Sequence, residues 1–210
     1  MEKIADMKIN DFLEVLRSKT PTPGGGSVSA IVAANAAALL SMSANYTIEN
    51  EKYAEFENTA LKVLAEVTSI IEELKALATA DVMAFQNYSD ISAIKRDTEE
   101  EKELRKRLMQ NALTDCMNVP LKIAELSYKL LNLSLKLSTN CNPNLVSDVF
   151  VACELSHAAL NSALANVKIN LKYIKDENII SLAEERLSVF ENKTELYNKT
   201  VDLTNNVMGF

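Results

Sequence analysis

One carboxylate stands alone in an apolar stretch of the sequence. Asp81 lies within Leu77-Ala78-Thr79-Ala80-Asp81-Val82-Met83-Ala84-Phe85, and it is the only charged residue between Lys75 and Asp90. A carboxylate among apolar groups is partly desolvated, which raises its pKa and suits it to general acid–base catalysis. An aspartate on the exposed face of an amphipathic helix would give the same pattern, so the pattern alone leaves both interpretations open.

A second candidate is the run Thr20-Pro21-Thr22-Pro23-Gly24-Gly25-Gly26-Ser27, which holds three of the four glycines and two of the four prolines. Proline keeps the preceding residue extended, while glycine permits positive φ and the close approach of another molecule. Ser27 is predicted to cap the following helix, whose free N–H groups would bind an anion or a polar heterocycle. A tight connection between two helices is the alternative. No lysine adjoins Ser27 and no strand precedes the run, which excludes a phosphate-binding loop.

Two further polar groups lie in the last third of the chain. Ser147 and Asp148 stand at the start of a predicted helix, where an acidic residue also complements the helix dipole by about 0.3–1 kcal/mol. Asn166 and Asn170 are four residues apart and therefore share one helix face, among apolar neighbours. Buried asparagines need hydrogen-bond partners, which either neighbouring helices or a ligand would supply.

The histidine and the cysteines indicate no metal site. His157 is the only histidine and is not expected to be a metal ligand, and nothing supports a Ser–His–Asp triad. Cys116, Cys141 and Cys153 form no CxxC pair and are predicted to be reduced thiols. We therefore expect no metal and no permanently bound cofactor.

Helical periodicity covers almost the whole sequence and must position these residues. Asn10 is predicted to cap a short helix. Thr98 and Glu101 fit a capping box, and Pro120 should kink or split the helix that follows them. The other predicted helices span 27–45, 52–87, 99–137, 147–173 and 176–205; the first of these is rich in alanine, which predicts a buried central helix or one at a subunit contact. The fold class is thus all-α, a single-domain bundle of about six helices over residues 1–210.

Composition narrows the class of protein. The 210 residues are 48% hydrophobic and 24% charged, as in an ordinary globular protein. The net charge of −7 disfavours nucleic acid and an anionic membrane surface as partners. No run of 18 apolar residues and no basic leader followed by an apolar stretch is present, so a cytoplasmic location is expected.

An ordered set of motifs resembles the cyclodeaminase/cyclohydrolase family, which comprises the C-terminal half of formiminotransferase-cyclodeaminase and stand-alone methenyltetrahydrofolate cyclohydrolases. The motifs extend over nearly the whole chain, from about Phe12 to Val189. None is specific alone, and their order carries the resemblance. They are Pro21-Thr22-Pro23-Gly24-Gly25-Gly26-Ser27-Val28, Asp81-x-x-Ala84-Phe85, Val119-Pro120-Leu121, Ser147-Asp148 and Asn166-Val167-Lys168-Ile169-Asn170-Leu171.

The resemblance implies an all-helical homodimer, a tetrahydrofolate substrate near the proline–glycine turn, and a catalytic role for Asp81. The leading hypothesis is a 5,10-methenyltetrahydrofolate cyclohydrolase in which Asp81 activates water. A formiminotetrahydrofolate cyclodeaminase is the alternative, and a non-catalytic helical folate-binding or scaffold protein is a more distant one. The sequence has no transferase half, which favours the hydrolase. The substrate-binding candidates are Pro23, Gly24, Gly25, Gly26, Ser27, Ser147, Asp148, Asn166 and Asn170.

Overall fold

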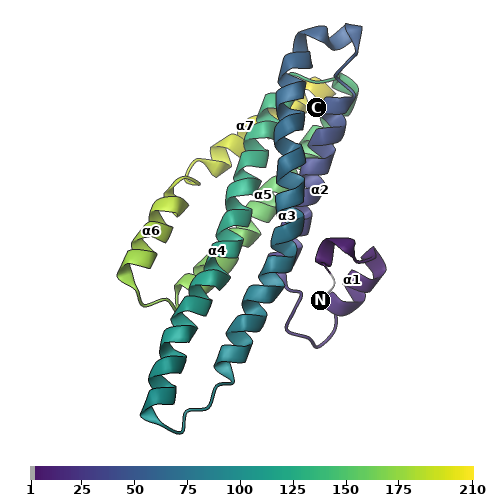
Figure 1. Cartoon of the computed structure of the whole chain (residues 1–210). Coiled ribbons are helices and arrows are strands. Elements are labelled where there is room, and N and C mark those ends of the chain that lie inside the picture. Colours follow the sequence, from purple (N-terminus) through teal and green to yellow (C-terminus); the bar gives the residue numbers. More distant parts are fainter. Residues whose placement is uncertain (1–2) are drawn as a thin grey trace.

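The computed structural model describes residues 3–210, and every regular element in this part of the chain is helical (Figure 1). Three short 3-10 helices, Ile4–Asp6, Glu51–Phe56 and Pro143–Leu145, lie between longer elements. The predicted all-α fold is confirmed. The α-helices are α1 (Ile9–Leu16), α2 (Gly25–Asn45), α3 (Glu57–Ser92), α4 (Glu99–Leu137), α5 (Val146–Leu171), α6 (Glu177–Ser188) and α7 (Lys193–Met208).

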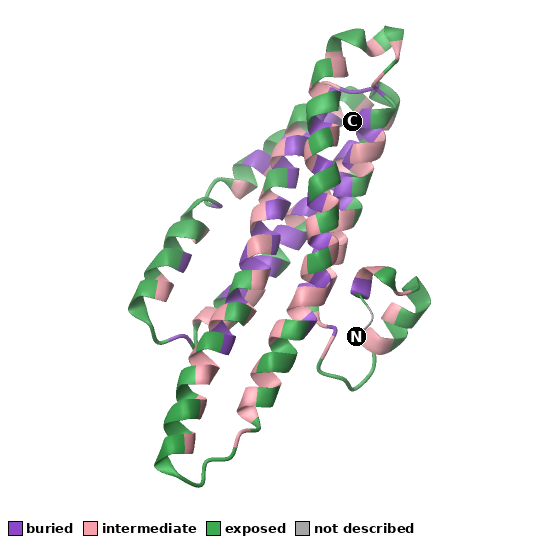
Figure 2. Cartoon of the chain, in the orientation of Figure 1, coloured by how far each residue is buried: buried purple, intermediate pink, exposed green. Residues whose placement is uncertain are grey.

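Four long helices, α2 to α5, lie side by side and form the body of the molecule (Figure 1). Buried residues concentrate along the middle of these helices, whereas α6 and the tip between α3 and α4 are mostly exposed (Figure 2). The core therefore runs along the bundle axis.

The alanine-rich helix α2 is central, as predicted. It packs along α3 and α5 and touches α4, and its alanines at 30, 33, 36 and 37 are fully buried. Small side chains let neighbouring helices approach closely. By length and composition α2 would pass as a membrane span, the only such helix in residues 3–210, but half of its most apolar stretch is buried in the bundle. That is the position of a core helix.

The hairpin of α3 and α4 follows the sequence prediction closely at its turn. The Thr98 hydroxyl accepts a hydrogen bond from the Glu101 backbone N–H at 3.2 Å, and the Glu101 carboxylate accepts one from the Thr98 backbone N–H at 3.1 Å. This reciprocal pair is a capping box. Pro120 lies inside α4, which continues as one helix, so the predicted split does not occur.

Several predicted boundaries differ from the structure. Helix α1 begins at Ile9 with Lys8 as its N-cap, so Asn10 is not the cap. Helix α5 spans 146–171 rather than 147–173. Helix α2 starts at Gly25 with Gly24 as its N-cap, so Ser27 is not the cap. Helix α3 spans 57–92 rather than 52–87. The single helix expected over 176–205 is divided into α6 and α7. Phe190 lies in the turn between the two helices, and its side chain, buried edge-on against Tyr128, anchors this turn to α4.

Candidate functional site

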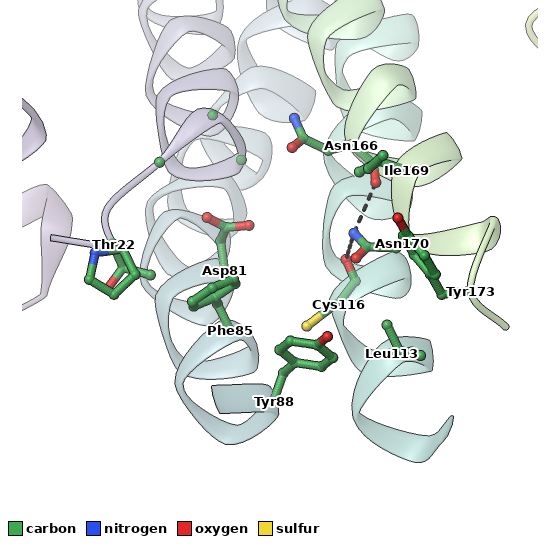
Figure 3. Close-up of a pocket in the computed structure, with 14 residues that line it drawn as sticks. Thr22, Asp81, Phe85, Tyr88, Leu113, Cys116, Asn166, Ile169, Asn170 and Tyr173 are labelled. Atoms are coloured by element: carbon green, nitrogen blue, oxygen red, sulfur yellow. Dashed lines mark hydrogen bonds between the residues drawn. The ribbon is translucent and has the colours of Figure 1, made fainter. Parts of the chain in front are cut away.

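A cavity of about 370 Å³ opens where the start of α2 meets α3, α4 and α5. Figure 3 shows Asp81, Phe85 and Tyr88 projecting from α3, opposite residues from α4 and α5. The proline–glycine turn closes one side. The lining residues are Pro21, Thr22, Gly24, Gly25, Gly26, Asp81, Phe85, Tyr88, Leu113, Cys116, Asn166, Ile169, Asn170 and Tyr173.

Ser27 holds the carboxylate of Asp81 in place. The Ser27 backbone N–H and its hydroxyl each lie 2.9 Å from Asp81 Oδ2. The same hydroxyl also lies 2.9 Å from the carbonyl oxygen of Ala78, one turn earlier on α3. Since a hydroxyl has a single proton, it donates to one of these two oxygens at a time, and its own oxygen can accept a hydrogen bond while it donates to Ala78.

Burial raises the pKa of Asp81 above its ordinary value, and the two hydrogen bonds from Ser27 oppose this effect. Burial also raises the pKa of the Cys116 thiol to about 11, helped by the nearby charges of Asp81 and Asp115. Cys116 therefore stays protonated near neutral pH and is a poor nucleophile. Among the described residues that line the cavity, Asp81 is the only one with a charged side chain.

Gly26 is required because Asp81 packs directly against its Cα. A Cβ at position 26 would overlap Oδ1 and Cγ of Asp81 and would lie 2.8 Å from Oδ2. At Gly25 an added Cβ would make an ordinary contact, 3.5 Å from Asn166 Nδ2. Positive φ, which the sequence allowed for these glycines, is not used at Gly24, Gly25 or Gly26.

The side-chain amides of Asn166 and Asn170 bond to backbone carbonyls through their nitrogens. The Asn166 Nδ2 donates to the Ser162 carbonyl at 2.9 Å. The Asn170 Nδ2 donates to the carbonyls of Cys116 and Asn166, both at 2.9 Å (Figure 3). Because these partners are acceptors, the amide nitrogens must face them, and each Oδ1 remains available as a hydrogen-bond acceptor for a ligand.

The structure brings together some of the predicted site residues and separates others. Gly24, Gly25, Gly26, Asp81, Asn166 and Asn170 all line the cavity. Pro23 is buried and does not line it, and Ser27 acts through its bonds to Asp81. Ser147 and Asp148 lie outside the cavity, in the first turn of α5. Asp148 is 18 residues from Asn166 on the same helix, which corresponds to about 27 Å.

Sequence reasoning missed several residues that line the cavity. Phe85 lies four residues after Asp81, and Tyr88 lies three residues after Phe85. This helical spacing predicts all three on one face of the helix. Ile169 lies three residues after Asn166, and Tyr173 lies three residues after Asn170, so they share a helix face with the asparagines. Leu113 and Cys116 carry no local signal, because only the packing of α4 against α5 brings them to the cavity.

His157 lies away from the cavity. Its ring stacks on Tyr197 with centroids 4.1 Å apart, and the Tyr197 hydroxyl donates to Glu154 at 2.6 Å. Within residues 3–210 no cluster of three or more His, Cys, Asp or Glu side chains could hold a metal ion.

Known proteins with similar sequences include cyclohydrolases and cyclodeaminases. The family model described as formiminotransferase-cyclodeaminase matches residues 8–189. A methenyltetrahydrofolate cyclohydrolase of Methylorubrum extorquens is 36% identical over 183 residues, which cover 87% of this chain and 86% of the relative. The formimidoyltransferase-cyclodeaminase of Mus musculus is 29% identical, and the match covers 89% of this chain but only 35% of the mouse protein.

A solved structure has the same fold. The crystal structure of formiminotetrahydrofolate cyclodeaminase from Thermotoga maritima superimposes with a TM-score of 0.87 and 29% identity. The match covers 98% of this chain and 99% of that one, so the helical architecture is shared from end to end.

We expect Gly26→Ala to destabilise the fold by about 1–3 kcal/mol, the usual effect of forcing extra atoms into a packed site. The added methyl group collides with the Asp81 carboxylate. Chemical unfolding measures the change. Gly25→Ala is the matched control, since its methyl group has room and alanine favours the helix. Equal stability of Gly26→Ala and Gly25→Ala would contradict the close contact.

Asp81→Asn should stabilise the fold at pH 7 but not at pH 3. A carboxyl whose pKa is raised by folding binds its proton more tightly in the folded state. Its stabilising contribution is therefore complete below the unfolded pKa and is lost as the pH rises through the folded pKa. Asparagine does not ionise, so the variant does not lose stability in this way as the pH rises. Unfolding free energies of both proteins at the two pH values measure it, and a difference that shrinks as the pH rises would refute the raised pKa.

Proposed function

The chain belongs to the formiminotransferase-cyclodeaminase family, and on this basis we propose that it is a 5,10-methenyltetrahydrofolate cyclohydrolase. Its product would be 10-formyltetrahydrofolate, formed in the one-carbon metabolism of folates. The observation that carries the proposal is the one carboxylate, the half-buried Asp81, in a cavity with no basic side chain among its described lining residues. The 36% identity with a methenyltetrahydrofolate cyclohydrolase over nearly the full length of both chains supports it.

The substrate's charge suits this cavity. A methenyl-folate carries a positive charge delocalised over N5, the bridging carbon and N10. Asp81 supplies a negative charge, and Asn166 and Asn170 supply amide oxygens with their donors already bonded elsewhere. Acceptors with fixed orientation can bind this cation without reorganising. The aromatic rings of Phe85, Tyr88 and Tyr173 offer flat apolar surface to the ring systems of the folate.

The proposed reaction uses Asp81 first as a base and then as an acid. Asp81 takes a proton from water while the water oxygen bonds to the methenyl carbon, which neutralises the cation. Asp81 then gives that proton to N5 as the bond between N5 and the carbon breaks. The remaining hydroxyl proton leaves to solvent as the formyl carbonyl forms, so the net products are 10-formyltetrahydrofolate and one proton. No resident cofactor is needed.

Ser27 is suited to both protonation states of Asp81. When Asp81 is ionised, the Ser27 hydroxyl donates to its Oδ2. When Asp81 holds the proton on Oδ1, the oxygen to which Ser27 does not donate, its Oδ2 still accepts the Ser27 backbone N–H. The carboxyl thus keeps a partner throughout the cycle.

Formiminotetrahydrofolate cyclodeamination is the second candidate, favoured by the likeness to the Thermotoga maritima structure. In that reaction N10 attacks the formimino carbon and ammonia leaves. Both reactions pass through a tetrahedral bridging carbon, so one carboxyl could transfer the proton in either. The proposal also includes a homodimer as the working unit, the cytoplasm as its compartment, and neither nucleic acid nor membrane as a partner.

Substituting Asp81→Asn should lower kcat for methenyl hydrolysis by about 10²–10⁴-fold, the usual contribution of a positioned acid–base group. Substrate binding and the helical circular dichroism should persist, because asparagine keeps the shape and can accept the Ser27 N–H. Asp90→Asn, an exposed aspartate near the end of the same helix, is the control and should keep full turnover. Wild-type kcat in Asp81→Asn would remove Asp81 from the chemistry.

Parallel assays with the two substrates decide between the two reactions. We expect purified protein to bleach the absorbance of 5,10-methenyltetrahydrofolate and to release no ammonia from 5-formiminotetrahydrofolate. Ammonia release without methenyl hydrolysis would replace the hydrolase by the deaminase. Calorimetry that detects no saturable binding of either folate would favour the non-catalytic scaffold.

A further inference from the structure

One face of α5 is left largely uncovered by the other described residues, 3–210. Its residues recur at alternating spacings of three and four, which places them along one stripe of the helix. Val151 is 43% exposed and Ile169 is 54% exposed, both high values for large apolar side chains. Only Asp148 in the stripe is charged. The stripe consists of Asp148, Val151, Leu155, Ala158, Ser162, Ala165 and Ile169.

Helix α2 extends this uncovered surface. It contains no charged residue from Gly25 to Asn45, and its outer side carries exposed Asn35, Ala38 and Asn45 between half-buried apolar residues. A helix without charged residues is normally covered on most of its surface. The two surfaces meet at the cavity, where Gly25 and Ile169 both form part of the wall.

The stripe on α5 matches a reversed copy of itself. Two large side chains, Val151 and Leu155, precede Ala158, and two small ones, Ser162 and Ala165, follow it before Ile169 at the far end. An antiparallel copy centred on Ala158 would oppose Val151 to position 165 and Leu155 to position 161 or 162. Large residues then meet small ones, and the small residues allow the backbones to approach.

The charges at the two ends of α5 favour the same arrangement. Asp148 lies near its start, whereas Lys168 and Lys172 lie at its end. None of the three belongs to an ion pair within residues 3–210. Antiparallel pairing brings the acidic end of one helix to the basic end of the other, and parallel pairing would bring like charges together.

We propose that a second copy of this chain covers this face, with its α5 antiparallel and crossing at Ala158, so that the partner's Asp148 completes the folate cavity. Asp148 and Ile169 lie ten and eleven residues from Ala158, so each is about 15–17 Å from the crossing point. The partner's Asp148 therefore stands beside Ile169, at the rim of the cavity that holds Asp81. Two such cavities arise, because a two-fold interface repeats each contact.

The catalytic consequence rests on the proposed function. Asp81 is the only charged side chain among the described lining residues, and a carboxylate from the second copy would add a second negative charge near the cationic substrate. The pairing itself rests on the shape and charge of α5 and holds whatever the substrate is.

Cross-linking tests the pairing. A residue on a two-fold axis meets its own copy, so Ala158→Cys should form an intermolecular disulfide under mild oxidation. Ala65→Cys, exposed on the outer side of α3, is the control and should stay monomeric on a non-reducing gel. The native cysteines are present in both variants and in the wild type. Lack of cross-linking at position 158, or equal cross-linking at position 65, overturns the proposed interface.

Mixing two variants tests the shared site. Asp81→Asn and Asp148→Asn should each lose turnover alone, the second by about tenfold because one of two nearby charges is removed. In a mixed dimer, one cavity combines an intact Asp81 with an intact Asp148 from the other copy. Equal mixing should therefore restore about a quarter of the wild-type sites.

The mixing result separates failure of this inference from failure of the proposed function. Full turnover by Asp148→Asn, or no gain on mixing after subunit exchange, overturns the contribution of the second copy while hydrolysis by the wild type stands. Absence of hydrolysis in the wild type instead overturns the proposed function, and the cross-linking result remains the test of the interface.

Discussion

The contact between Ser27 and Asp81 is the constraint on which the site depends. Ser27 lies in the first turn of α2 and Asp81 far along α3, yet backbone and side-chain hydrogen bonds join them at 2.9 Å. The contact is feasible only because Gly26 has no Cβ and because the buried alanines of α2 let α3 pack close to it. The same contact fixes the carboxylate that burial makes a stronger base. Fold and chemistry thus share one interaction.

Local signals predicted most of the fold. The capping box at Thr98 and the apolar periodicity of α3 and α4 depend on neighbours in sequence, so they were readable without the structure. The division between α6 and α7 was not, because the turn between them is anchored by Phe190 against Tyr128, some sixty residues earlier. The start of α2 was misjudged for a related reason: Ser27 has a capping residue's chemistry, but its hydroxyl serves Asp81 and Ala78 on another helix.

The candidate site was predictable to the extent that its residues share helix faces. Asp81 was visible as the one charge in an apolar stretch, and the asparagine pair by its spacing. Phe85 and Tyr88 could have been added from the same face of α3. Cys116 could not, since its carbonyl reaches Asn170 only through the register of α4 against α5. Sequence spacing predicts which residues share one helix face, whereas the packing of the helices decides which of these faces line the cavity together.

The position of Asp148 in the structure differs from what the family resemblance implies. The family resemblance groups it with the folate site, but α5 is continuous from residue 146 to 171, and its rise keeps Asp148 about 27 Å from Asn166. No rotation of side chains closes that distance within one chain. Asp148 therefore either serves only the dipole of its own helix or reaches a cavity in another copy. The uncovered stripe on α5 favours the second, because its large residues at 151 and 155 can meet small ones at 162 and 165 of another copy. Complementing the dipole would not require an apolar surface that continues to the rim of the cavity.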